Sequence, residues 1–161
     1  MRSRQSISKS LVLTKETDIP GVTVIMNREE IREKTMQLIY QMDITDEFDY
    51  TRLSPVDEDA KILDKAQALA TLNAVKDHRN EIDEVIRACL DKWSFSRVAR
   101  TDLAILRTAL AEMMYVDSIP SSVSINEAVK LSKKYSDEKS YAFVNSVLSK
   151  ADKYLARREQ D

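Results

Sequence analysis

The chain has 161 residues, of which 43% are hydrophobic and 32% charged, and its formal net charge is −2. This length and composition indicate one globular domain, and no apolar run approaches the ~20 residues that a membrane-spanning helix needs. The only glycine is Gly21, which excludes the glycine-rich phosphate loops of kinases, P-loop proteins and Rossmann folds. The single cysteine, Cys89, permits no internal disulfide, so we expect a cytoplasmic protein.

Few residues in the sequence point to catalysis. His78 and Cys89 are the only histidine and cysteine, so they cannot form a metal cluster by themselves. Cys89 lies between Ile86 and Leu90 at helical spacing, which is typical of a core residue. The carboxylates form no pattern beyond solvated helix faces. We therefore expect neither an enzyme nor a protein that holds a cofactor or a metal.

The first residues of the chain differ in composition from the rest. Residues 1–26 start with a basic, serine-rich stretch, pass through a turn at residues 17–21 and end in the β-prone run Val22–Ile25. We expect this segment to be an appended, poorly ordered extension, with Met26 as an alternative translation start. The helical domain is then predicted to occupy residues 27–161.

Apolar residues at helical spacing predict about six helices over this domain. They are expected from Asn27, a good N-cap, to about residue 42, and then at about residues 57–76, 81–93, 98–116, 124–135 and 138–158. An acidic connection is expected at residues 43–59. The helix over 98–116 is apolar around most of its circumference, so it is predicted to be the central, most buried one.

The fifth of these helices carries a motif that sets its start. Ser124 and Glu127 match a capping box with Ser124 as the N-cap, and Ser121 is a rival cap one turn earlier. Asn126 in this helix and Asn145 in the last one are mediocre helix formers among apolar positions. We expect both amides to cap or bridge helices within the fold rather than to contact a ligand.

These residues, taken in order, resemble the NusB family of transcription antitermination proteins. The matching positions in the C-terminal half are Trp93, Arg97, Asp102, Ala104–Arg107, Glu112, Pro120, Ile125–Ala128 and Phe143–Asn145. In the first helix they are Arg28, Arg32, Gln37, Tyr40, Gln41 and Asp43. The resemblance covers residues 27 to about 152 and implies an all-α fold of two three-helix bundles packed across each other.

The resemblance also implies a function on nascent RNA. NusB-like proteins bind boxA-type single-stranded RNA together with the small-subunit ribosomal protein NusE. With other Nus factors they make RNA polymerase resist termination, notably in ribosomal RNA operons. Such binding needs cations for the phosphates and aromatic rings for unpaired bases. The predicted RNA-binding residues are Arg28, Arg32, Lys34, Gln37, Tyr40 and Phe143.

The sequence departs from the family's pattern where RNA is expected to bind. Glu29 and Glu30 stand where relatives are denser in arginine, and their charges would repel phosphate. Ser146 replaces a glycine that follows the family's Phe-Val-Asn. We therefore predict weak RNA binding by the isolated chain, strengthened by the ribosomal protein.

Other interpretations stay open. Phe143 also fits a core position, and Arg28 and Arg32 also fit a solvated helix face, paired with Glu29 or Glu33. The same fold serves as a protein-interaction module at the N-terminus of some ribosomal RNA cytosine methyltransferases. A third function is a helical homodimer with no role in RNA binding.

Overall fold

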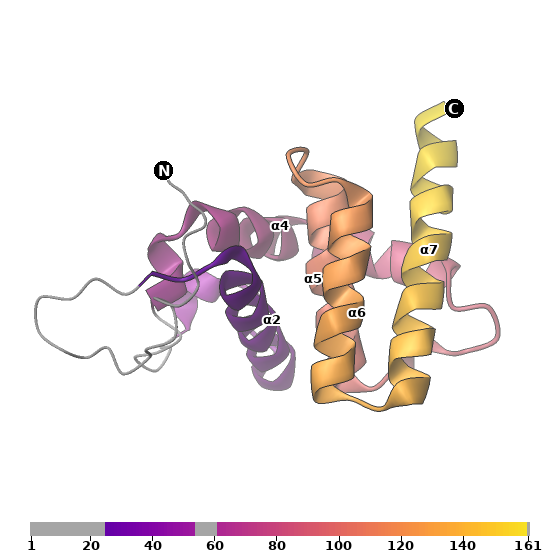
Figure 1. Ribbon diagram of the computed structural model, residues 1–161, viewed down its shortest axis with the longest axis horizontal. Helices are drawn as coiled ribbons and strands as arrows, with labels where there is room; N and C mark the ends of the chain where they lie inside the picture. Colours follow the sequence, from indigo (N-terminus) through magenta and orange to yellow (C-terminus); the bar gives the residue numbers. More distant parts are fainter. Residues whose placement is uncertain (1–24, 54–60, 161) are drawn as a thin grey trace, which may run out of the picture.

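The computed structural model describes residues 25–53 and 61–160, and within these ranges the chain is helical with no strand (Figure 1). Its α-helices are α2 (Arg28–Thr45), α4 (Ala66–Ala88), α5 (Arg100–Tyr115), α6 (Ser121–Tyr135) and α7 (Glu138–Gln160). The 3-10 turns η1 (Tyr50–Arg52), η2 (Lys61–Asp64) and η3 (Phe95–Arg97) lie between them. The predicted all-α class is confirmed. The predicted extension over residues 1–26 lies almost wholly outside the described residues.

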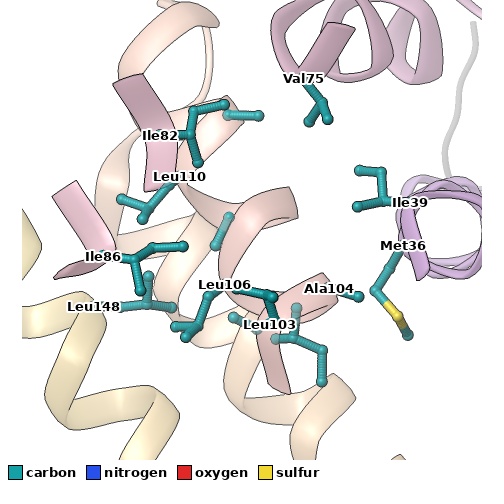
Figure 2. Packing of buried hydrophobic residues seen from close by; sticks show 14 of the residues in the cluster. Met36, Ile39, Val75, Ile82, Ile86, Leu103, Ala104, Leu106, Leu110 and Leu148 are labelled. Atoms are coloured by element: carbon teal, nitrogen blue, oxygen red, sulfur yellow. The ribbon is translucent and has the colours of Figure 1, made fainter. Parts of the chain in front are cut away.

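Helix α5 is the centre of the fold. Eleven consecutive residues, Asp102–Glu112, are buried, and α5 packs against α2, α4, α6 and α7. It lies between α2 and α7 in Figure 1. Its side chains reach in several directions, because Leu106 lies near Ile86 of α4 while Ala104 faces Met36 of α2 (Figure 2). The sequence's prediction of a central helix is therefore confirmed.

Helix α4 joins two helices that the sequence separates. The predicted helices over 57–76 and 81–93 form one element with a kink at His78, whose φ of −130° and ψ of 28° are non-helical. The His78 ring stacks on Tyr115 of α5 with ring centroids 4.2 Å apart, which ties the kink to the central helix. The predicted start at Asp57 lies outside the described residues.

The C-terminal end of α4 also differs from the prediction. The helix ends at Ala88 rather than Trp93, and Asp91 has a left-handed φ of 56° that turns the chain away from the helix axis. Trp93, at the end of the predicted helix over 81–93, fits an inward position at helical spacing with Ile86 and Leu90. It is instead 54% exposed in the loop before η3.

Helix α6 begins one turn earlier than the capping box predicts. Its N-cap is Pro120, with no side-chain cap, and Ser121 is the first helical residue rather than the cap. Ser124 is buried inside the helix, where its hydroxyl donates a 2.8 Å hydrogen bond to Glu112 of α5. The predicted capping box is therefore wrong. The motif predicts a hydrogen bond between Ser124 and the backbone of its own helix, but the partner of Ser124 is Glu112 on the neighbouring helix.

Candidate nucleic-acid interface

Trp93 and Phe143 form the aromatic part of a surface hollow beside the start of α5. Their rings meet edge to face, with centroids 6.0 Å apart and an interplanar angle of 61°. The Arg97 guanidinium lies 5.8 Å from the centroid of the Trp93 ring. The hollow has a volume of about 250 Å³, and its lining includes Val98, Ala99, Asp102, Lys139 and Ser140. Phe143 is half-buried, so its ring lies at the edge of the core with one side accessible.

Local backbone geometry places these side chains at the surface. Helix α4 ends at Ala88, and the left-handed residue Asp91 then turns the chain. The turn η3 follows and presents Arg97, whose backbone N–H donates to the carbonyl of Ser94 at 3.0 Å. Phe143 precedes the buried Val144 of α7 and so lies beside the apolar stripe of that helix. Two segments that are 50 residues apart in sequence are thereby brought together.

The charges around the hollow favour a negatively charged ligand at its rim. Arg97, Arg100 and Lys139 are exposed cations at or beside it. Asp102 is only 5% exposed, and burial raises the pKa of its carboxyl above the ordinary range. Its Oδ1 has no hydrogen-bond partner among the described residues. The hollow therefore combines exposed cations at its rim with a buried carboxyl that has one unpaired oxygen.

Tyr40 and Gln37 lie on α2, outside the lining of the hollow. Tyr40 is 38% exposed, whereas the Gln37 amide donates a 2.7 Å hydrogen bond to the hydroxyl of Tyr135 on α6. The C-terminal half of α2 is tied to the start of α5 by an ion pair between Asp43 and Arg100, 3.4 Å apart. Arg100 directly follows Ala99, so this ion pair links α2 to the segment that lines the hollow.

Lysines of α6 neutralise acidic side chains of α2. Lys134 lies 2.7 Å from a carboxylate oxygen of Glu33, which also accepts a hydrogen bond from Tyr135. Partial burial opposes ionisation of Glu33, but these hydrogen bonds outweigh it and lower its pKa. Glu29 pairs with Lys130 at 3.0 Å. Of the two acids that were expected to repel phosphate, Glu29 is therefore compensated by a cation of another helix.

Arg32 lies in the interior, unlike either of its predicted settings. It is 7% exposed, and its Nε and Nη2 donate to the two oxygens of Glu112 at 2.7 and 3.1 Å. Its Nη1 lies 3.7 Å from Glu127 rather than from Glu29 or Glu33. A guanidinium enclosed in this way has no free edge for a phosphate. The sequence did carry a signal for this pair. Glu112 is a carboxylate within an apolar helix, and a buried charge needs a counter-charge, so Glu112 predicts a buried cation beside it.

The other two predicted cations are at the surface of α2 but apart from the hollow. Arg28 is exposed at the first residue of the helix, where its carbonyl accepts a 3.0 Å hydrogen bond from Gln67. It precedes Tyr40 by 12 residues, a separation of about 18 Å along the axis. Lys34 is half-buried between them. Arg28 and Tyr40 therefore lie towards opposite ends of α2.

Comparison with known proteins decides the family. The model of the NusB family matches residues 29–153, most of the chain. The chain belongs to the NusB family. It is 44% identical over 136 residues to the transcription antitermination protein NusB of Geobacillus kaustophilus, covering 82% of this chain and all of that relative. It is 42% identical over 127 residues to the NusB of Oceanobacillus iheyensis, covering 78% and 98%.

Solved structures agree with the NusB fold. T. maritima NusB superposes with a TM-score of 0.65 at 26% identity, covering 80% of this chain and 92% of that one. NusB from Aquifex aeolicus gives 0.63 at 29% identity, covering 81% and 90%. The structure of antitermination factors NusB and NusE in complex with dsRNA gives 0.60 at 24% identity and supports the fold alone, covering 79% and 96%. The predicted NusB-like architecture is confirmed.

The two asparagines of the NusB signature are not buried amides. Asn126 and Asn145 are both exposed, and neither has a hydrogen-bond partner among the described residues. They cap no helix end, and they line a groove between α6 and α7. The expectation that they hold the fold together is therefore wrong.

Two kinds of feature are absent from the described part of this NusB chain. No helix in the described part is both long and apolar enough to cross a lipid bilayer. Across residues 25–53 and 61–160, His, Cys, Asp and Glu side chains form no group of three or more that could hold a metal ion.

Proposed function

We propose that this chain is a transcription antitermination factor that binds single-stranded boxA-type RNA together with a NusE-type ribosomal protein. Relatives that are 44% and 42% identical carry the name transcription antitermination protein. A structure with the same fold holds antitermination factors NusB and NusE in complex with dsRNA. The role is non-catalytic and cytoplasmic, and it reaches RNA polymerase and the other Nus factors through the assembled complex.

The observation that carries this proposal is the accessible pair of Trp93 and Phe143 with Arg97 beside it. An aromatic platform next to cations is what unpaired bases and their phosphates require, because stacking contributes roughly 1–3 kcal/mol per base. Tyr40 offers a second exposed aromatic ring, on α2. Arg28, Lys34 and Gln37 extend the contact along α2, and Arg32 positions that helix from inside.

The isolated chain is expected to bind RNA weakly. Its net charge is −2, so attraction is confined to the cations around the hollow and is sensitive to salt. A ribosomal-protein partner that adds its own basic surface would supply the missing charge. The ribosomal protein would then raise the affinity for RNA as well as join the complex.

The test is binding of fluorescently labelled boxA RNA, measured with and without the ribosomal protein. Phe143→Ala and Trp93→Ala should each weaken binding by about tenfold, corresponding to one lost stacking contact. Tyr154→Ala, an aromatic residue later on α7 that lies beside Arg158, should have no effect. If both hollow variants bound RNA like the unaltered chain, the proposed interface would be wrong.

The same assay separates the two alternatives. A pure interaction module would bind the ribosomal protein normally and show no RNA-dependent signal in any combination. A homodimer with no RNA role would bind neither and would sediment at twice the monomer mass.

A further inference from the structure

A second hollow, with a volume of about 620 Å³, lies between α6 and α7. Its walls include Val123, Asn126 and Lys133 from α6, and Tyr141, Ala142 and Asn145 from α7. None of its lining residues belongs to the hollow of Trp93 and Phe143. We call it the α6–α7 groove. The two helices are neighbours joined by a short turn (Figure 1).

Asn126 and Asn145 offer unused hydrogen-bonding groups to this groove. Both are exposed, and within the described chain neither carboxamide is bonded to another residue. Asparagine is a poorer helix former than alanine, so these positions weaken their helices without any compensating contact inside the fold. A carboxamide carries one acceptor and two donor hydrogens, the same kinds of group as a peptide unit. Two of them, on facing helices, suit a ligand that presents successive peptide groups.

The charges of the groove favour a polypeptide over a nucleic acid. Lys130 is held by both Glu127 and Glu29, each 3.0 Å away. Lys133 forms no ion pair with a described residue, and its Nζ lies 5.0 Å from the centroid of the Tyr141 ring. One free cation is too little for a nucleic-acid backbone, because a protein binds such a backbone by neutralising several phosphates. It is enough for a single carboxylate.

We propose that the α6–α7 groove binds an extended polypeptide segment of a partner protein. Main-chain amides of the segment pair with the Asn126 and Asn145 carboxamides, and one acidic side chain of the segment pairs with Lys133. Val123, which is 41% exposed, and Ala142 supply apolar contact between these polar groups. The site is separate from the proposed RNA interface and does not depend on it.

The experiment selects binders to the full chain from displayed random peptides of about 10 residues. Such peptides, when extended, exceed the ~22 Å length of α6. Selected peptides, synthesised and titrated against the full chain, should be enriched in Asp or Glu. They should lose affinity by about tenfold with Asn126→Ala and again with Asn145→Ala, because each substitution removes hydrogen bonds to the main chain.

Matched controls make the outcome decisive. Asn80→Ala removes an exposed asparagine from α4, away from the groove, and should leave peptide affinity unchanged. Phe143→Ala should also leave it unchanged, which separates this site from the RNA interface. Peptides insensitive to both groove substitutions, or a selection that enriches nothing, would overturn the proposal. So would a short single-stranded RNA that bound in an Asn126-dependent way, because the groove would then be a nucleic-acid site.

Discussion

The buried pair of Arg32 and Glu112 allows a sharp test of how this fold uses charge. Glu112 is 2% exposed and accepts hydrogen bonds from Arg32 and from Ser124. Glu112→Gln keeps the shape of the side chain and removes its charge. Arg32 would then remain buried with only Glu127 nearby, at 3.7 Å.

The expected loss is large because the remaining charge cannot reach water. Breaking a buried pair by removing one partner costs about 3–5 kcal/mol. At about 2–4 °C per kcal/mol for a chain of this size, the melting temperature should fall by roughly 6–20 °C. An exposed pair provides the contrast. Arg87 and Glu84 are 2.8 Å apart but 49% and 71% exposed, and such pairs contribute at most about 1 kcal/mol.

Urea unfolding of the two variants, Glu112→Gln and Glu84→Gln, measures the difference directly. A double variant, Arg32→Met with Glu112→Leu, should recover most of the lost stability, since it removes both charges together. If Glu112→Gln were no more destabilising than Glu84→Gln, the strength of these ion pairs would not depend on their burial, contrary to the prediction. Arg32 holds α2 against α5 through Glu112. An Arg32 variant that bound RNA more weakly would therefore do so because α2 had shifted.

Three further predictions concern charge and helix propensity. Glu33→Gln should tighten RNA binding severalfold by freeing Lys134, and it should raise the salt dependence of binding by about one counterion; an unchanged slope would contradict this. Asp102→Asn should be more stable than the unaltered chain at neutral pH but not below about pH 4. The raised pKa of the Asp102 carboxyl means that its ionisation lowers the stability of the native state as pH rises. Equal stability of Asp102→Asn and the unaltered chain in urea unfolding at pH 7.5 would contradict this prediction. Asn126→Ala should stabilise the fold by up to ~0.5 kcal/mol through better helix propensity, and a clear loss in thermal unfolding would reveal a partner for the amide.

Sequence periodicity and capping chemistry were sufficient to predict most of the helices. Asn27 caps α2 as predicted, its side chain accepting a 2.8 Å hydrogen bond from the backbone of Glu30. The all-round apolarity of α5 correctly indicated its central place. The kink at His78 was interpreted as a break, because a polar stretch with one non-helical residue resembles a loop in sequence.

Polar pairing was harder to predict because its partners are distant in sequence. Arg32 and Glu112 are 80 residues apart, and no local pattern links them. Ser124 matched a local motif, but its hydroxyl bonds to that same distant glutamate. The exposure of Asn126 was available from the sequence, since it lies about 200° around the helix from the buried Ser124 and Ala128. Its place among apolar positions of a family motif was instead interpreted as a role in capping or bridging helices.

The central position of α5 has a consequence for how the molecule opens. Helices α2, α4, α6 and α7 all pack on α5, so none of these four helices can separate without exposing apolar surface of α5. Amide protons in the middle of α5 should exchange with solvent only when the whole domain unfolds, and exchange there should report the global free energy. The aromatic hollow and the α6–α7 groove would then be rigid surfaces on one cooperative unit, and partners bound at either would protect the same protons.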